Sequence, residues 1–296
     1  MISPGSFAQP MRVDRAAHRR ASVDLDQALA VVVADGRVLA DASGVTLLGA
    51  DAWDQAHVVC YLGRDGDRDV VAVSAAALPE SDPPLEPLRA LLGRLGADDR
   101  GERDRELATT AVAMSHWHQA HARCPRCGAP TEAAPGGWQR RCPACERDHY
   151  PRTDPAVIVA ITDPDDRLLM AHASYWSPRR YSHLAGYLEP GESLEQAVHR
   201  EVAEESSLKL TNLTYAGSQP WPFPASMMVG YTARATDPAF TLDLDEISDA
   251  RWVTRVDLEE AVADGSIIVA PRGSIARRML EDWHGDAARL GSLQGD

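Results

Sequence analysis

Apolar residues in the N-terminal third of the chain form short runs between turn signals. Residues 28–33, 57–62 and 69–73 are rich in valine and alanine, and the Asp35-Gly36 pair follows the first run. Runs of this length that are bounded by glycine are typical of β-strands. We therefore expect a small antiparallel sheet between residues 25 and 110.

Helical spacing appears next, and then the pattern changes. Residues 88–95 and 107–122 repeat apolar positions three or four residues apart, which predicts two helices. The charged run at 98–106 between them is expected to be a solvated loop. After Pro151, strands alternate with helices, beginning with an apolar strand at 156–161. The change predicts a separate C-terminal domain.

Composition is that of an ordinary folded protein. The 296 residues suffice for two or three small domains, and 44% of them are apolar. No apolar run approaches the ~20 residues that a membrane span needs. Residues 1–22 lack the apolar segment of a secretory signal, so we interpret them as a disordered tail of a cytoplasmic protein. The net charge of −14 argues against broad electrostatic capture of nucleic acid.

Four of the five cysteines form two Cys-x-x-Cys pairs. The pairs are Cys124 with Cys127 and Cys142 with Cys145, and 14 residues separate them. Two such turns complete a tetrahedral site for one structural zinc ion at Zn–S distances of ~2.3 Å. Two disulfides fit poorly with an intracellular chain. A zinc ribbon of this kind could also serve as a nucleic-acid or protein-binding module.

Glutamates crowd one flank of a predicted helix. Ser193 and Gln196 form a capping-box pattern, so a helix should begin at the residue after Ser193. At ~100° per residue, Glu201 and Glu205 project only ~40° apart, and Glu204 lies ~60° to one side. A solvated acidic helix is the commoner fate of such a stretch.

Repulsion between these carboxylates calls for a cation. Arg200 can pair with Glu204 across one turn, but it cannot also neutralise Glu201 and Glu205. Oxygen ligands suit a hard divalent ion such as Mg²⁺ or Mn²⁺, and such an ion would bind phosphate groups.

The segment around these glutamates resembles the Nudix box. That box reads Gly, five residues, Glu, seven residues, Arg-Glu-aliphatic, one residue, Glu-Glu, one residue, Gly-aliphatic. The matching positions are Gly186, Glu192, Arg200, Glu201, Val202, Glu204, Glu205 and Leu208. Ser207 replaces the closing glycine, which suits a left-handed helix end, and the serine should cost about 1 kcal/mol.

A second motif narrows the resemblance. The segment 218–226 contains three prolines in five positions, which hold Trp221 and Phe223 on a stiff backbone. It is similar to the motif of the NADH pyrophosphatase (NAD-capped RNA hydrolase) subfamily of Nudix hydrolases, which also carry a zinc ribbon before the catalytic domain.

The resemblance implies an α/β (α+β) fold, a Nudix α/β/α sandwich with a mixed sheet. We expect a disordered tail at 1–22, an N-terminal α/β domain at 23–119, the zinc ribbon at 120–150 and the catalytic domain at 151–296. It also implies a homodimer.

The implied activity is hydrolysis of the pyrophosphate bond of NADH or NAD⁺ to nicotinamide mononucleotide and AMP, and removal of NAD caps from RNA 5′ ends. The implied catalytic residues are Glu201, Glu204, Glu205 and Glu246. Glu201, Glu205, Glu246 and the carbonyl of Ala185 would ligate two or three Mg²⁺ or Mn²⁺ ions. The implied substrate contacts are Arg89, Tyr150, Tyr187, Gln219, Pro220, Trp221, Pro222, Phe223, Pro224, Ala225, Ser226 and Ala276.

One position departs from the subfamily, and two alternatives stay open. A glutamate before a ribbon tryptophan, which contacts substrate in the subfamily, corresponds to Gly137 before Trp138. The substrate could instead be ADP-ribose or another nucleoside diphosphate derivative. The chain could also be a zinc-ribbon binding or regulatory protein whose Nudix domain is inactive.

Overall fold

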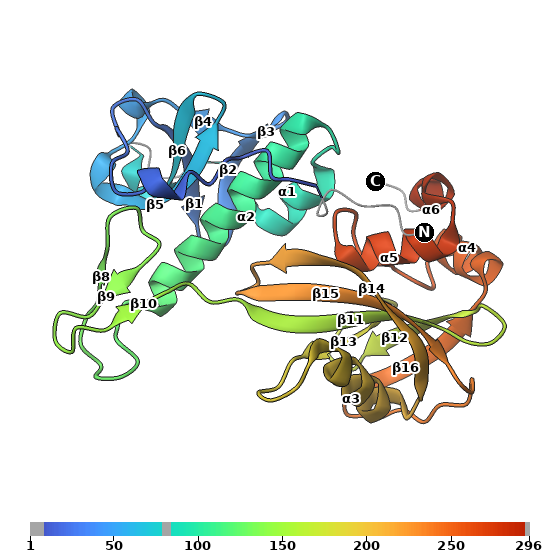
Figure 1. Cartoon of the computed structure of the whole chain (residues 1–296). Coiled ribbons are helices and arrows are strands. Elements are labelled where there is room, and N and C mark those ends of the chain that lie inside the picture. The colour runs from blue at the N-terminus through green and yellow to red at the C-terminus, as the bar shows by residue number, and fades with distance from the viewer. Residues whose placement is uncertain (1–8, 79–83, 294–296) are drawn as a thin grey trace. The chain divides into compact units, whose positions relative to one another are not determined.

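The computed structural model describes residues 9–78 and 84–293, which form two compact units (Figure 1). The N-terminal unit comprises residues 10–153 together with the short segment 221–225. The C-terminal unit comprises residues 154–220 and the chain from residue 226 onward. Each unit has its own hydrophobic cores, and each is described by itself below.

The N-terminal unit contains a seven-stranded sheet with the central order β3-β2-β1-β6-β5. Its strands are β1 (Leu29–Ala34), β2 (Arg37–Asp41), β3 (Gly44–Val45), β4 (Leu47–Leu48), β5 (Val58–Asp65), β6 (Arg68–Ser74) and β7 (Leu85–Pro87). Strands β1 and β6 pair in parallel, so the sheet is mixed and the expectation of an antiparallel sheet is wrong. The alternation of apolar residues predicts a strand but carries no information about its direction.

Two helices cover this sheet, and the second is longer than expected. Helix α1 spans Leu88–Arg94 and α2 spans Asp99–Ala120. The expected loop at 98–106 is therefore wrong, because these charged residues form the first turns of α2. The Asp98 side chain accepts a hydrogen bond from the Gly101 amide at 2.8 Å and caps the helix. Buried Asp104 accepts hydrogen bonds from the side chain of Arg103 and the Val45 amide.

The described part of the expected tail is also ordered, which corrects that expectation. Val13 and Ala16 are only 2% and 5% exposed, and the backbone of Asp14 forms an antiparallel β-bridge with Arg64 of β5. The backbone amides of Arg12 and Val13 donate to the Glu106 carboxylate. Two small apolar side chains give too weak a periodic signal to predict such a segment. Residues 1–8 lie outside the described part of the chain.

A small antiparallel sheet with the order β10-β9-β8 follows helix α2. Its two-residue strands are β8 (Glu132–Ala133), β9 (Arg140–Arg141) and β10 (Asp148–His149). This cysteine-containing segment is anchored on β5, because the Trp138 indole donates to the carbonyl of Tyr61 at 2.7 Å and the Tyr61 amide donates to the Gly136 carbonyl at 3.0 Å.

The C-terminal unit is a mixed sheet between helices, as expected. The strand order is β14-β15-β11-β12-β16, and β13 also pairs with β11. The strands are β11 (Asp154–Thr162), β12 (Leu168–Ala173), β13 (Leu184–Tyr187), β14 (Leu210–Trp221), β15 (Ser226–Ala235) and β16 (Ile247–Val253). The central pair β11 and β15 is parallel, whereas β13 runs antiparallel to β11.

Helices cover both faces of this sheet (Figure 1). Helix α3 (Leu194–Ser206) lies on one face, and α5 (Ile275–His284) lies on the other with α4 (Arg255–Ala263) and α6 (Ala287–Leu293) nearby. Strand β11 serves both layers: Val157 and Val159 pack into the α3 core, while Ile158 and Ala160 pack into the α5 core. In the described ranges, no helix combines the length and apolar character that a membrane crossing requires.

Candidate catalytic site and zinc centre

Helix α3 begins where the sequence predicts. The Ser193 hydroxyl accepts from the Gln196 amide at 3.1 Å, and the Gln196 side chain accepts from the Ser193 amide at 2.8 Å. Val198 and Val202 are fully buried and hold the helix on the sheet. Ser207 ends the helix with φ 60°, the left-handed conformation that the Nudix-box glycine would favour.

Arg200 connects the helix to the loop before it. Its Nε donates to Glu192 Oε1 at 2.6 Å, and Nη2 donates to the Tyr187 carbonyl at 2.9 Å. Nη1 lies 3.0 Å from Glu204 Oε2 and 2.9 Å from Glu201 Oε1. The expected pairing with Glu204 is present, and contact with Glu201 was not expected. These carboxylates, Glu192 first, raise the pKa of Arg200 above its usual range.

Glu201 lies against a glycine backbone. A Cβ atom at Gly186 would lie 1.9 Å from Cδ of Glu201 and about as close to both oxygens, so only glycine leaves room for this carboxylate. Gly186 is on β13, directly after Ala185. Burial raises the pKa of Glu201, and the Arg200 guanidinium opposes that shift.

Glu205 is the most constrained of the acids. Its residue is 6% exposed, and its Oε2 atom is buried with no hydrogen-bond partner among the described residues. Burial raises its pKa to about 8, and the neighbouring charges of Glu201, Glu246 and Glu204 contribute to the rise. A buried carboxylate without a donor is costly unless a cation binds it.

Glu246 reaches this group from a distant part of the chain. The segment before it docks on the end of α3, because the amides of Thr241 and Asp243 donate to the carbonyls of Ser206 and Glu205. Glu246 is exposed and precedes β16, and its charge acts on both Glu201 and Glu205. The structure therefore brings together the four glutamates that the resemblance marks as catalytic.

These residues fit a hard divalent cation. All the side-chain donors are carboxylate oxygens, one of them is buried without a partner, and their mutual repulsion is only partly balanced by Arg200. Among the described residues, only the four cysteines bring three or more possible ligand atoms within 4.8 Å of one another, so the glutamate oxygens lie farther apart than the sulfurs. An ion with six ligands, three of them these carboxylates, would keep coordination positions for water and substrate.

The cysteine cluster has the geometry of a closed zinc site. The Sγ atoms of Cys124 and Cys145 lie 3.7 Å apart, and those of Cys127 and Cys142 lie 3.5 Å apart. Four sulfurs at ~2.3 Å from one zinc ion would lie about 3.8 Å from each other. A disulfide would need ~2.05 Å, so the sulfurs are unbridged. The Cys145 amide lowers the pKa of the Cys142 thiol, which favours the thiolate.

The structure explains the departure at Gly137 and also gives the role of a histidine of α2. Gly137 has φ 74°, and a Cβ there would lie 2.2 Å from the Val59 carbonyl oxygen, so no side chain fits where the subfamily has its glutamate. Among the residues that the structure describes, the group of possible zinc ligands contains the four cysteines and no histidine of α2. His118 bonds instead to the Gly137 carbonyl and to Arg140, both at 2.8 Å.

Gln219 is buried in the C-terminal unit. It is 2% exposed; its Oε1 accepts from the Ile275 amide at 2.6 Å and its Nε2 donates to the Gly273 carbonyl at 2.7 Å. Gln219 thus holds the start of α5, the helix that carries Ala276. Buried His183 bonds to the Ala276 carbonyl at 3.2 Å and was not singled out in the sequence, where a lone histidine gives no signal.

Arg89, Trp221 and Phe223 come together in the N-terminal unit. The Arg89 guanidinium lies 4.2 Å from the Phe223 ring centroid and 5.1 Å from that of Trp221. The two rings meet edge to face at 4.9 Å and pack against the core of this unit. The Arg89 position implied by the resemblance therefore does lie beside the aromatic motif.

The remaining predicted substrate positions differ in how far they are exposed. Tyr150 and Tyr187 are 64% and 54% exposed, as a binding surface requires. The Tyr187 hydroxyl lies 3.0 Å from that of buried Ser226. Of the others, Pro222 is buried, Ala225 and Ala276 are half-buried, and Pro220 and Pro224 are exposed.

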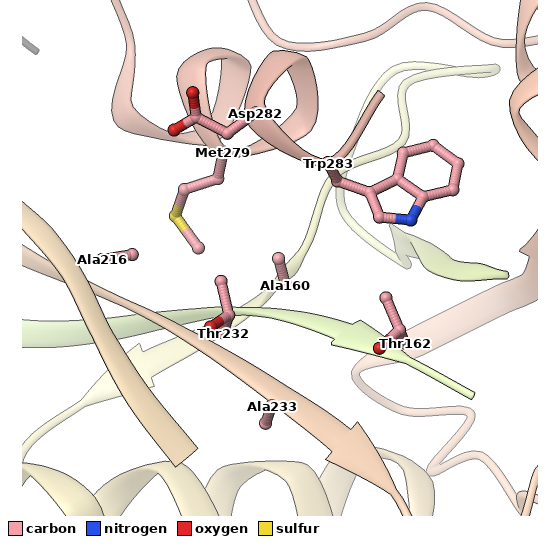
Figure 2. A pocket seen from close by; sticks show the side chains of 8 residues that line it. All are labelled: Ala160, Thr162, Ala216, Thr232, Ala233, Met279, Asp282 and Trp283. Carbon is pink, nitrogen blue, oxygen red and sulfur yellow. The ribbon is translucent and has the colours of Figure 1, made fainter. Parts of the chain in front are cut away.

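A pocket of about 160 Å³ lies elsewhere in the C-terminal unit (Figure 2). Met279, Asp282 and Trp283 of α5 face Ala160 and Thr232 of the sheet across it. Because α5 covers the sheet face opposite α3, this pocket is separate from the glutamate group (Figure 1).

Comparisons with known proteins agree with this arrangement. The NUDIX domain family matches residues 152–271, and the NADH pyrophosphatase zinc ribbon domain matches residues 119–150. The chain is 39% identical over 267 residues to NAD-capped RNA hydrolase NudC of Mycobacterium bovis, covering 86% of this chain and 82% of the relative. This chain is a Nudix hydrolase of the zinc-ribbon NADH pyrophosphatase subfamily.

Other Nudix relatives are more distant. NAD-capped RNA hydrolase NUDT12 of Homo sapiens is 32% identical over 261 residues, which cover 84% of this chain and 51% of the relative. A solved NUDIX hydrolase from Nitrosomonas europaea is 25% identical, with a TM-score of 0.37, and covers 45% of this chain and 90% of its own.

Proposed function

We propose that this Nudix hydrolase cleaves the pyrophosphate bond of NADH or NAD⁺ to nicotinamide mononucleotide and AMP, and removes NAD caps from RNA 5′ ends. The observation that carries the proposal is the buried carboxylate of Glu205 beside Glu201, whose Oε2 has no hydrogen-bond partner among the described residues, in a chain whose relatives are named for hydrolysis of NAD-capped RNA.

Glu201, Glu205, Glu246 and the Ala185 carbonyl would hold the divalent ions, which we propose to be Mg²⁺ or Mn²⁺, two or three per site. Such ions supply charge neutralisation for a diphosphate and a bound water of lowered pKa. The protein's part is positioning: Arg200 fixes the loop to α3, and Gly186 leaves the space in which the Glu201 carboxylate lies.

Substrate contacts stay proposals. Tyr187 and Tyr150 present exposed rings suited to stacking on a base, and Arg89 sets the orientation of the Trp221 and Phe223 rings. Gln219 positions the start of α5, which carries Ala276, through its hydrogen bonds to the backbone of Gly273 and Ile275. One zinc ion per chain would stabilise the ribbon without contacting substrate, since four thiolates leave no open position.

A side-by-side assay tests the function. Purified protein with Mg²⁺ or Mn²⁺ is given NADH, NAD⁺, NAD-capped RNA and ADP-ribose, and the products are identified by mass spectrometry. We expect nicotinamide mononucleotide with AMP from the dinucleotides and 5′-monophosphate RNA from the capped strand. Preferred cleavage of ADP-ribose would contradict the proposal, and so would the absence of metal-dependent hydrolysis.

Three further expectations remain predictions. A homodimer is testable by native mass spectrometry, and a cytoplasmic location by fractionation. The division at residues 119 and 150 is testable by limited proteolysis, and we expect a cut near residue 150, because the two compact units divide between residues 153 and 154.

A further inference from the structure

An aromatic and basic loop joins β12 to β13 in the C-terminal unit. Residues 174–180, here called the 174–180 loop, read Ser-Tyr-Trp-Ser-Pro-Arg-Arg. Tyr175 is 81% exposed, more than any other large hydrophobic side chain in the described part of the chain. Nothing in the glutamate site requires an aromatic ring in solvent at this point.

The loop is firmly held despite its exposure. The Trp176 amide donates to the Ala173 carbonyl at 3.0 Å, and a ring nitrogen of His172 lies 2.7 Å from the Arg180 carbonyl oxygen. Trp176 packs against the α3 core, and the Arg180 guanidinium lies 4.9 Å from its ring centroid. Arg179 donates to the Gly265 carbonyl at 3.1 Å. A ligand that stacks here would order little of the protein.

The loop begins at the glutamate site. The Ser174 amide donates to the Glu246 carbonyl at 2.8 Å, and its hydroxyl donates to the Asp245 carbonyl at 2.7 Å. Ser174 is thus attached directly to the segment that carries Glu246, and Tyr175 is the next residue of the loop.

The 174–180 loop is positively charged, whereas the chain as a whole is negatively charged. Neither Arg179 nor Arg180 has a carboxylate within 4.0 Å among the residues that the structure describes. Two unneutralised guanidinium groups are notable in a protein with a net charge of −14. They favour an anionic partner at this loop, although the overall field makes a long polyanion contact unfavourable.

We propose that the 174–180 loop binds the first nucleotide beyond the NAD cap of a single-stranded RNA, with its base stacked on Tyr175 and its phosphate near Arg179 and Arg180. The inference rests on the proposed function and narrows its substrate class. In a capped RNA the strand continues from the adenosine, so the next nucleotide is the RNA unit nearest the glutamates. Stacking on an aromatic ring accepts any base.

The test compares Tyr175→Ala and Tyr175→Phe on three substrates: NAD⁺, NAD⁺ extended by one nucleotide, and an NAD-capped 10-mer. Tyr215→Ala is the matched control, since Tyr215 is also exposed in this unit. We expect Tyr175→Ala to lower kcat/KM on both extended substrates about 5- to 50-fold, with NAD⁺ unchanged. Tyr175→Phe should retain the wild-type values, and Tyr215→Ala should show no such difference between substrates.

A binding arm separates this inference from the proposed function. The affinity for a labelled 5′-monophosphate 10-mer, measured by fluorescence anisotropy, should fall by a similar factor in Tyr175→Ala even if wild type cleaves no dinucleotide. Equal kcat/KM losses on NAD⁺ and on capped RNA, or unchanged binding of the 10-mer, would overturn the inference. A changed oligomeric mass in Tyr175→Ala would do so too, by assigning the loop to contact with a second copy.

Discussion

The zinc centre and the glutamate group both have ligands for metal ions, but they differ in how completely the protein surrounds the ion. Cys124, Cys127, Cys142 and Cys145 bring their sulfurs to the spacing of a tetrahedron. In the glutamate group, Oε2 of Glu205 is buried with no hydrogen-bond partner in the part of the chain that the structure describes, and Glu246 is exposed. A closed set of ligands stabilises a fold, whereas an open set can share its ion with water and substrate.

The two sites also differ in how far apart their ligands lie along the sequence. Each cysteine pair is local, so one turn places two ligands, and two turns finish the site. The glutamate group needs α3, the Gly186 strand and the distant segment before β16, which are held by Arg200 and by backbone bonds to the end of α3. The open site therefore depends on the packing of the whole C-terminal unit.

The largest effect should follow from Glu205→Gln. Loss of the buried carboxylate should reduce kcat about 10²- to 10³-fold, because the charge that holds the divalent ions is removed. The variant should stay folded and gain stability without metal at pH 8, since the unpaired buried charge is gone. Steady-state kinetics and urea unfolding measure the two effects.

Glu195→Gln is the control, because it makes the same change in charge on the same helix, where Glu195 accepts a bond from Tyr231. It should leave kcat within about threefold of wild type. Comparable losses in the two variants would show that the effect is not specific to the metal-binding position.

Gly186→Ala should be the next most damaging. The new methyl group would occupy the space of the Glu201 carboxylate and displace it, which we expect to lower kcat/KM about 10- to 100-fold. Combined with Glu201→Gln, the losses should not add, because both changes act through one carboxylate. Full additivity in that double-mutant cycle would refute the packing argument.

Cys124→Ser should act on the other site. We expect the loss of bound zinc and a fall of about 3 kcal/mol or more in the free energy of unfolding of the N-terminal unit. Cys60→Ser is the control, since Cys60 is buried in the core and outside the cluster, and its zinc content should be unchanged. The zinc content is measured by mass spectrometry. One full equivalent of zinc per chain in Cys124→Ser would contradict the assignment.

The smallest effect should be a pH dependence near the zinc ribbon. Burial lowers the pKa of His118, whose neutral ring bonds to both Arg140 and the Gly137 carbonyl. As the pH falls, His118 is therefore protonated in the unfolded chain before it is protonated in the folded protein. The stabilisation by neutral His118 is complete above about pH 6.5 and is lost as the pH falls toward the lowered pKa of the folded state. His118→Gln should flatten that slope in urea unfolding, and an unchanged slope would refute the role.

The elements that sequence predicted well are those with local signals. The capping box fixed the start of α3, the i, i+4 spacing put Glu201 and Glu205 on one flank, and the Cys-x-x-Cys pairs gave the ribbon. Each depends on residues within a few positions of one another, so geometry along the chain is sufficient.

Features that depend on distant contacts were missed. Residues 98–106 form helix because Asp98 caps it and Asp104 finds partners in the core, neither of which charge patterning reveals. The parallel pairing of β1 with β6 is set by topology. Likewise, nothing next to Gln219 in the sequence indicates that its side-chain amide forms hydrogen bonds with the backbone at the start of α5.

The most direct test is a titration of Mn²⁺ into zinc-loaded wild type and Glu205→Gln, followed by calorimetry, with zinc measured in the same samples. The open-site account predicts Mn²⁺ binding to wild type, at least a tenfold weaker affinity in Glu205→Gln, and one zinc per chain in both. Equal Mn²⁺ affinity in the two proteins would contradict it.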